Sequence, residues 1–129
     1  MICSIRSKLC RSSELAGLEL GGVPVATALS IRTGLPVLFV RKQAKAYGTR
    51  QVIEGGQVAG RRLLIVEDVI TSGGQVVASC SELRSARAIV EDAICVIDRE
   101  AGGAAALASA GIRLKVLFMK SDLEDRSRV

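Results

Sequence analysis

The chain has 129 residues, of which 49% are apolar and only 2% aromatic, and 18 Lys and Arg against 13 Asp and Glu give it a formal net charge of +5. This length predicts one domain built around one sheet, and a core of Val, Leu, Ile and Ala favours parallel strands covered by helices. The absence of histidine excludes Ser-His-Asp and Cys-His nucleophilic schemes and any His-ligated zinc. The positive charge favours an anionic partner, and at this point a phosphorylated metabolite and RNA both fit.

Residues 1–14 lack clear periodicity and contain no continuous apolar run, so neither a signal peptide nor a membrane span is predicted. We expect a poorly specified leader over 1–14 and one core domain over 15–129. The four cysteines show no CxxC spacing, which predicts core residues or free thiols in a reducing cytosol rather than a disulfide framework. They are Cys3, Cys10, Cys80 and Cys95. A cytoplasmic protein is therefore expected.

The first half of the chain predicts one helix and one strand between two loops. Residues 16–22, AGLELGG, predict a glycine-bearing loop, and the apolar spacing over 23–31 predicts a helix. Residues 36–40, PVLFV, predict a strand. The long basic segment 41–57 contains glycines in both halves and is a candidate mobile loop.

The second half repeats a strand and helix pattern. Strands are predicted over 62–66, 94–97 and 114–119, with helices over 74–88 and 104–110 and a polar tail at the end. Successive strand and helix units imply right-handed crossovers and a parallel sheet. The polar residues that follow each strand should therefore share one functional edge.

Residues 62–75, RLLIVEDVITSGGQ, join an apolar strand to two acids and a hydroxyl-rich glycine turn. The strand would carry Glu67 and Asp68 to the sheet edge, where carboxylates can accept hydrogen bonds from vicinal hydroxyls or hold a magnesium shell. The turn at 71–74 offers hydroxyls and main-chain N–H groups at a helix start, which favours an anion. No lysine follows the glycines, which excludes a Walker loop. The pattern predicts a site for a phosphorylated sugar, although acids and glycine turns also end strands in many parallel α/β proteins.

Four motifs occur in an order that resembles the orotate phosphoribosyltransferases of the type I phosphoribosyltransferase family. They are AGLELGGVPVATALS (16–30), VRKQAKAYG (40–48), LLIVEDVITSGG (63–74) and VIDREAGG (96–103). The resemblance implies an α/β fold with a parallel sheet flanked by helices. It implies transfer of 5-phosphoribosyl from 5-phosphoribosyl 1-diphosphate to orotate in pyrimidine biosynthesis, with Mg²⁺ as cofactor. A homodimer is expected, and neither a membrane nor a nucleic acid is expected as a partner.

The resemblance also implies site residues. The catalytic residues would be Lys45, Glu67 and Asp68. The diphosphate would be bound by Gly21, Gly22, Arg41, Lys42, Lys45 and Tyr47, and orotate by Thr71 and Arg99. The ribose 5-phosphate would be bound by Glu67, Asp68, Val69, Ile70, Thr71, Ser72, Gly73, Gly74 and Gln75. No direct metal ligand is implied, because magnesium would be held through the diphosphate, with Glu67 or Asp68 as candidate ligands.

Each motif has a plainer alternative. Main-chain N–H groups at Gly21 and Gly22 could approach a diphosphate, or the segment could be an ordinary helix N-cap turn. By resemblance, this loop often has a strained cis non-proline peptide in the family. The cations over 41–45 could neutralise the departing diphosphate or form a solvated basic stretch. By resemblance Lys45 lies on a loop that closes over a neighbouring subunit's site, and Tyr47 stands where the family commonly has histidine. Arg99 could pair with the orotate carboxylate or with a neighbouring acid.

The resemblance is incomplete at the N-terminus. Family members normally begin with several tens of residues that are absent here and that form a hood over the base, so we expect an N-terminally truncated core. An apolar sheet edge would then be uncovered, which favours dimerisation. A late start codon, a truncated paralogue and a reduced protein with another role are all open explanations. The alternative function is a non-catalytic regulator of nucleotide metabolism that binds ribose phosphate or RNA.

Overall fold

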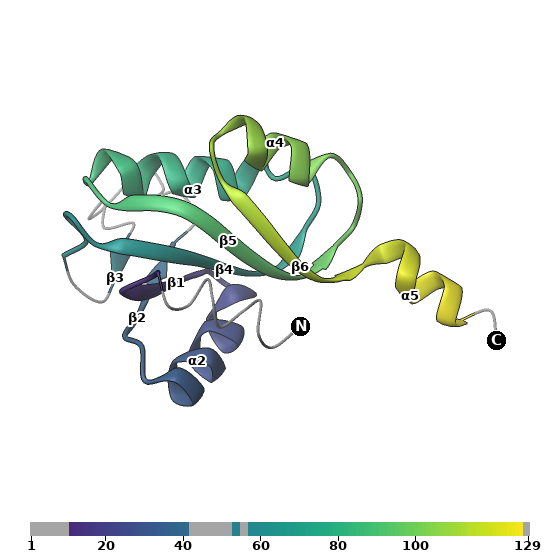
Figure 1. Cartoon of the computed structure of the whole chain (residues 1–129), viewed down its shortest axis with the longest axis horizontal. Coiled ribbons are helices and arrows are strands. Elements are labelled where there is room, and N and C mark those ends of the chain that lie inside the picture. The colour runs from purple at the N-terminus through teal and green to yellow at the C-terminus, as the bar shows by residue number, and fades with distance from the viewer. Residues whose placement is uncertain (1–10, 42–52, 55–56, 128–129) are drawn as a thin grey trace.

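A computed structural model describes residues 11–41, 53–54 and 57–127, which form one twisted sheet with helices on both faces (Figure 1). The sheet order is β3-β2-β1-β4-β5-β6, and all neighbouring strands are parallel except β3, which is antiparallel to β2. The strands are β1 (Glu14–Leu18), β2 (Val37–Val40), β3 (Ile53–Glu54), β4 (Arg62–Ile70), β5 (Ile89–Asp98) and β6 (Arg113–Met119). The predicted α/β class with a parallel sheet is confirmed.

The helices divide between the two faces. Helix α2 (Gly22–Thr33) covers one face, whereas α3 (Gly74–Ser85) and α4 (Gly103–Ser109) cover the other, and α5 (Lys120–Ser127) follows β6 and projects from the body (Figure 1). Within the described ranges no helix is long and apolar enough to cross a membrane.

Strand β4 lies in the middle of the sheet and is buried on both faces. Leu63 and Ile65 belong to the core cluster beneath α3 and α4, whereas Leu64 and Val66 belong to the cluster beneath α2. A parallel strand covered on both sides needs apolar residues at consecutive positions, which explains the uninterrupted run in the sequence. Each fully buried Leu, Ile or Val side chain contributes about 1.5–3 kcal/mol to stability.

The order of the strands creates a switch point between β1 and β4. The chain leaves β1 through α2 on one face and leaves β4 through α3 on the other, so the two connections separate at the ends of adjacent strands. Ligands of open α/β sheets bind in the crevice outside the carboxyl ends of strands at such a point. The pairing of β1 with β4 ends at Gly17 and Val66, whereas β4 continues to Ile70. The last residues of β4 therefore border the crevice on their β1 side.

Part of the first motif is strand rather than loop. We predicted a loop over 16–22, but Glu14–Leu18 form the central strand β1, with all five residues buried. The sequence gives weak strand signals here because Ala16 and Gly17 have little side chain. The structure shows why: a Cβ on Gly17 would lie 2.8 Å from the Cβ of Ala26, so a small residue is required where α2 packs closely. Pairing with β2 and β4 on both sides outweighs the low local propensity.

Other element boundaries also differ from the predictions. Helix α3 ends at Ser85 rather than at residue 88, because Arg87 adopts a left-handed conformation with φ 68° and Ala88 N–H returns to Leu83 O at 3.0 Å. The strand predicted over 94–97 begins at Ile89, and β4 runs four residues past Val66. The polar tail is helical, because α5 has Asp122 in its first turn and a Lys120–Glu124 ion pair along one side.

Candidate functional site

The turn after β4 provides a preformed place for an anion. Residues 67 and 69–76 line a hollow of about 100 Å³, which is larger than the roughly 30 Å³ of one water molecule. Among the described residues, none accepts a hydrogen bond from the main-chain N–H groups of Thr71, Ser72 or Gly73. The next N–H groups belong to the first turn of α3, which has no side-chain cap. Unused donors and the positive end of the helix dipole therefore point at one small cavity.

Gly73 is required at the centre of this turn. Its φ is +82°, which L-residues rarely adopt, and an added Cβ would lie 2.8 Å from Leu107 Cδ1 and 3.1 Å from Gly103 Cα. Gly103 is equally restricted, because its Cβ would meet Ile70 Cγ2 and would lie 2.7 Å from Thr71 O. The start of α4 thus presses against the turn and fixes its shape. Gly103 was not predicted as a site residue, because its role depends on contact between two loops that are separate in the chain.

The two acids of β4 have different surroundings. Glu67 is only 8% exposed, and its Oε1 accepts a hydrogen bond from Asp68 N–H at 3.0 Å. Asp68 is half-buried, and its Oδ1 accepts from Val69 N–H at 2.7 Å. Within the described part of the chain, the Oδ2 of Asp68 accepts no hydrogen bond. Asp68 therefore keeps one carboxylate oxygen that could receive a ligand hydroxyl. Glu67, the next residue along β4 and so on the opposite face of the strand, lines the hollow at the turn.

The first glycine motif lies directly beside Asp68. Gly21 precedes α2, and any Cβ there would collide with the Asp68 carboxyl group. A Cβ on Gly22 would collide with Val66 O, so both glycines bring the α2 loop against the end of β4. The peptide between Glu19 and Leu20 is cis, as the family resemblance implied. The loop also leads into the N-terminus of α2, which agrees with the alternative of an ordinary helix N-cap turn. A helix N-terminus can also bind an anion, so the two roles are compatible.

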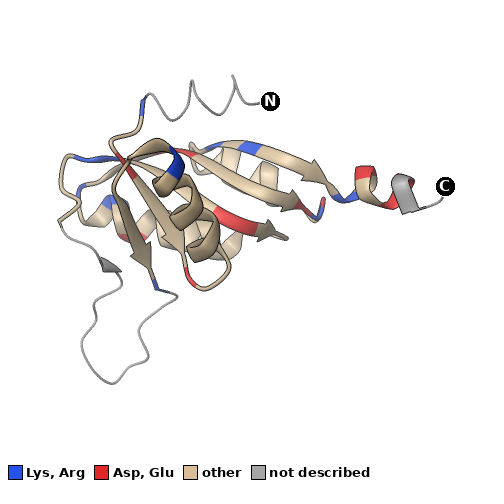
Figure 2. Cartoon of the chain, turned by 90° about the horizontal axis from the view of Figure 1, so that it is seen from below, with Lys and Arg blue, Asp and Glu red and all other residues tan. Residues whose placement is uncertain are grey.

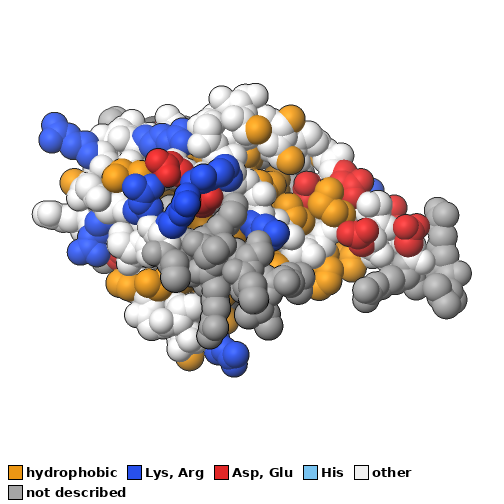
Figure 3. All heavy atoms as spheres, in the orientation of Figure 1, with side chains coloured by type: hydrophobic (Ala, Val, Ile, Leu, Met, Phe, Trp, Pro, Cys, Tyr) orange, Lys and Arg blue, Asp and Glu red, His pale blue; other side chains and the backbone are white. Residues whose placement is uncertain are grey.

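The predicted cations are only partly described. Arg41 follows β2, and its Nε lies 3.8 Å from Glu19 Oε1, which joins the end of β2 to the α2 loop. Lys42, Lys45 and Tyr47 lie outside the described residues, so their predicted roles stay predictions. Most described Lys and Arg side chains gather toward the starts of the strands, away from the acids at the ends of β4 and β5 (Figures 2 and 3).

Arg99 lies at the same edge of the sheet as the turn. Asp98 pairs in register with Ile70, and Arg99 N–H donates to Ile70 O at 3.0 Å. Arg99 is exposed, and it forms no ion pair with Asp98 or Glu100, both of which the structure describes. The alternative of a neighbouring salt bridge is therefore wrong, and the guanidinium is available to an anionic ligand.

The remaining predicted residues of the 5-phosphate site differ in what they can offer. Thr71, Ser72, Gly74 and Gln75 are exposed. Val69 is 37% exposed, whereas Ile70 is only 2% exposed and packs in the core. Ile70 can therefore contribute through its main chain alone.

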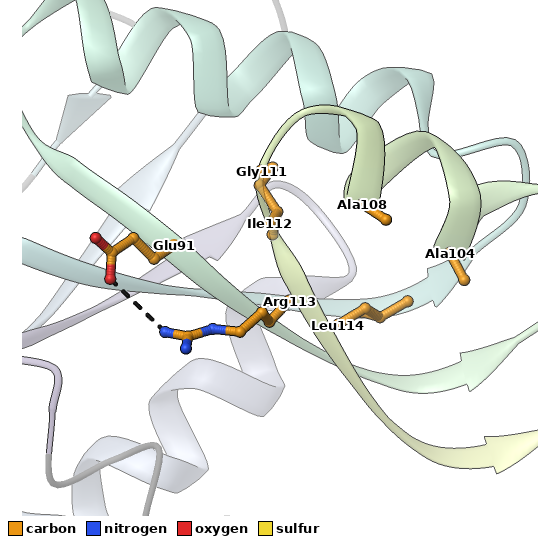
Figure 4. Close-up of a pocket in the computed structure, with 7 residues that line it drawn as sticks. All are labelled: Glu91, Ala104, Ala108, Gly111, Ile112, Arg113 and Leu114. Carbon is orange, nitrogen blue, oxygen red and sulfur yellow. Dashed lines mark ion pairs between the residues drawn. The ribbon is translucent and has the colours of Figure 1, made fainter.

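A larger hollow lies elsewhere in the described structure. It has a volume of about 730 Å³ between α4 and β6 and opens widely to solvent (Figure 4). Its charged lining is already paired, because Arg113 Nη2 lies 3.6 Å from Glu91 Oε2 and 3.1 Å from Asp92 Oδ2. The smaller hollow at the turn has the available donors, so we assign the functional site there.

Two buried thiols of the core carry strongly shifted pKa values. Burial raises the pKa of Cys95 from 9.0 to about 12, and the nearby Asp98, Glu67 and Asp68 add to the shift. Burial also raises the pKa of Cys80 from 9.0 to about 11, against the opposing charge of Arg84. Both are free cysteines, as predicted, whereas Cys3 and Cys10 lie outside the described residues.

These thiols predict a loss of stability at high pH. Above pH 9 the unfolded chain releases thiol protons that the folded chain still holds, so the free energy of unfolding should fall as the pH rises from 9 toward about 11. Denaturant titrations at several pH values measure this slope. The double variant Cys80→Ala/Cys95→Ala should show a shallower slope, and equal slopes in both proteins would contradict the prediction.

The switch-point crevice, the anion turn and the adjoining acid together define a phosphoribosyltransferase fold and site. The family model described as Phosphoribosyl transferase domain matches residues 14–111, and the chain belongs to this family. Its relatives include the orotate phosphoribosyltransferase of Nocardioides sp., which is 49% identical over 110 residues, covering 85% of this chain and 62% of the relative. The orotate phosphoribosyltransferase of Thermoplasma volcanium is 39% identical over 123 residues, covering 95% of this chain and 74% of the relative.

Solved structures agree with this assignment. The orotate phosphoribosyltransferase of Aeropyrum pernix matches with a TM-score of 0.85 and 33% identity over 92% of this chain and 66% of that one. The Mycobacterium tuberculosis enzyme in complex with 5-phospho-alpha-D-ribosyl 1-diphosphate matches with a TM-score of 0.75 and 34% identity, over 87% of this chain and 65% of that one. The chain thus spans between three fifths and three quarters of the length of these four proteins.

Proposed function

We propose that the chain transfers the 5-phosphoribosyl group from 5-phosphoribosyl 1-diphosphate to orotate, giving orotidine 5-phosphate and diphosphate. The observation that carries this proposal is the contact of three elements at the switch point. The turn at 71–74 has available N–H groups, Glu67 lines the hollow at that turn, and the Asp68 carboxylate lies against the main chain at Gly21. One crevice thus contains a group for each part of the substrate, namely its phosphate, its ribose hydroxyls and its diphosphate.

Each part of the substrate has a place in this arrangement. The 5-phosphate lies in the turn, where N–H groups and the hydroxyls of Thr71 and Ser72 donate to it. The ribose hydroxyls donate to Asp68. The diphosphate lies beside Gly21 and Gly22, with Arg41 near the same loop and Lys42, Lys45 and Tyr47 in the segment that follows. The orotate carboxylate pairs with Arg99, close to Thr71. A planar guanidinium favours such two-pronged hydrogen bonding to a carboxylate.

Catalysis then needs position and charge rather than a covalent intermediate. The bond between the anomeric carbon and the diphosphate loosens first, and the cations of the 41–45 segment neutralise the leaving group. The turn and Asp68 hold the sugar while Arg99 places the nitrogen of orotate against the anomeric carbon. Closure of the loop that carries Lys45 over the sugar would exclude water from a reactive, cation-like centre.

The residues present fit a magnesium ion held together with the substrate. The described residues contain no group of three or more His, Cys, Asp or Glu that could hold a metal. Magnesium usually takes one or two carboxylates and completes its shell with water and substrate phosphates, so Asp68, with Glu67 behind it, is a sufficient protein contribution. When bound, the ion would add positive charge at the diphosphate oxygens.

We also propose a homodimer located in the cytoplasm. The α2 side of the molecule carries two widely exposed apolar side chains, Leu20 at 79% and Ile31 at 80%. Burial of such residues against a second copy would remove apolar surface from water. Light scattering of the purified chain measures the mass of the assembly.

Turnover by the purified chain tests the proposed activity directly. Orotidine 5-phosphate, diphosphate and Mg²⁺ are mixed with the folded protein, and formation of orotate is followed by absorbance. We expect saturable turnover. Its absence from properly folded protein would reject the enzymatic proposal while leaving ligand binding to be judged separately.

Arg99→Gln should weaken recognition of the base. Loss of the guanidinium removes a charge-assisted pair with the orotate carboxylate, so the Kd for orotate should rise by about 10- to 100-fold. The Kd for ribose 5-phosphate should stay within about twofold, because Arg99 touches the turn only through its main chain. Calorimetry with each ligand measures both values, and Arg32→Ala at the exposed end of α2 is the matched control. Equal weakening for both ligands would contradict a role in base selection.

A further inference from the structure

A side-chain link joins the loop that carries Arg99 to the C-terminal helix. The Oε1 of Glu100 accepts hydrogen bonds from Ser121 Oγ at 2.5 Å and from Ser121 N–H at 3.2 Å. Ser121 lies in the first turn of α5, whose N–H groups have no partner within the helix. Glu100 and Ser121 are 21 residues apart in the chain. We call this pair of bonds the Glu100–Ser121 link.

The backbone at Glu100 is held in an unusual conformation. Its φ is +59°, in the left-handed region that costs a residue other than glycine about 1–2 kcal/mol. Its N–H donates to Asp98 Oδ1 at 2.9 Å, and Asp98 is only 3% exposed. The conformation is therefore fixed from both sides, by Asp98 at the main chain and by Ser121 at the side chain. The hydrogen bonds from Ser121 lower the pKa of Glu100, which agrees with a carboxylate held in its charged form.

This geometry determines the direction in which Arg99 leaves the sheet. Arg99 lies between two fixed points, because its own N–H is bonded to Ile70 O and the next residue is fixed by Asp98 and Ser121. On the far side, Gly103 packs against Ile70 and Thr71 without room for a Cβ. The restrained main chain fixes the point from which the Arg99 side chain leaves the sheet, so less backbone freedom is lost when the guanidinium pairs with a planar carboxylate.

We infer that Glu100 is a positioning residue that, through Ser121 of α5, orients Arg99 toward the carboxylate of the pyrimidine. This inference rests on the proposed function. In the described structure α5 mainly contacts β6. The inference gives α5 a further part in selecting the base. Glu100 itself need not touch any substrate.

The test compares variants of the full chain by calorimetry, with orotate and ribose 5-phosphate as separate probes. Glu100→Gly removes the carboxylate yet adopts φ +59° without steric cost, so it isolates the link from backbone strain. We expect the Kd for orotate to rise about tenfold in Glu100→Gly and in Ser121→Ala, with the Kd for ribose 5-phosphate within about twofold. Glu100→Gln and Ser121→Thr keep an acceptor and a hydroxyl and should recover most of the affinity.

The control removes a different contact at the same helix end. Asp122 Oδ2 accepts from Met119 N–H at 3.3 Å, so Asp122→Ala weakens the start of α5 without touching the Arg99 loop. It should leave the Kd for orotate unchanged. Amide hydrogen exchange over residues 98–103 should become faster in Ser121→Ala without any ligand.

The outcomes separate this inference from the proposed function. If the unsubstituted chain binds orotate and Glu100→Gly binds it equally well, the inference is overturned and the function stands. Equal weakening by Asp122→Ala would also overturn it, because the effect would then belong to α5 as a whole. If the unsubstituted chain binds ribose 5-phosphate but not orotate, the proposed choice of base fails, and the assignment of Glu100 fails with it.

Discussion

Asp68→Asn is expected to lower kcat/KM by about 10²- to 10³-fold. The substitution keeps the size of the side chain and the Oδ1 that accepts from Val69 N–H. It removes the negative charge that we propose faces the ribose hydroxyls and the cation-like sugar. Because Asp68 is half-buried at the rim of the sheet, the fold should be preserved, and a thermal melt should show little change.

The matched control for Asp68 is Asp125→Asn on the exposed face of α5. It makes the same chemical change far from the crevice and should leave kcat/KM unchanged. A second comparison is Glu67→Gln, which alters the more buried acid and should reduce stability as well as activity. An Asp68→Asn variant with full activity would show that the carboxylate does not face the reacting sugar.

Gly103→Val should be the most damaging single substitution for the phosphate site. Its Cβ would collide with Ile70 Cγ2 and crowd Thr71 O, which are the residues that lead into the anion turn. We expect a loss of about 3 kcal/mol or more in the free energy of unfolding and no measurable binding of ribose 5-phosphate. Denaturant titration and calorimetry measure the two effects.

Ala104→Val provides the comparison for Gly103. It adds a larger side chain at the next position of α4, which is exposed, and should cost about 0.5 kcal/mol through helix propensity. Binding of ribose 5-phosphate should be retained in this variant. If Gly103→Val were as stable as Ala104→Val, the close packing of α4 on the turn would be wrong.

The segment around β4 could be predicted because local and tertiary signals agree there. Four consecutive apolar residues suit a strand buried on both faces, and the acids and glycines that follow suit the crevice at its end. The same agreement holds for α2 and β6, whose predicted ranges differ from the structure by at most two residues at either end.

Other features depend on contacts that no local pattern contains. Strand β1 is held by β2 and β4 on its two sides, so its weak propensity misled the prediction. Glu67 and Asp68 both lie past the last residue of β4 that pairs with β1, and their different burial depends on what packs against each face of the strand. The Glu100–Ser121 link and the contact of Gly103 with Ile70 join residues far apart in the chain. The residue types and the order of the four motifs therefore predicted the candidate site residues. How these residues differ in burial and contacts required the structure.

The proposed function depends above all on binding of the phosphate of a phosphorylated ribose by the turn after β4. A titration of the ¹⁵N-labelled chain with ribose 5-phosphate, followed by amide chemical shifts, tests it most directly. We expect saturable shifts that are largest at residues 71–75 and at Asp68. Shifts concentrated among the arginines at the starts of the strands, with the amides of 71–75 unmoved, would contradict it.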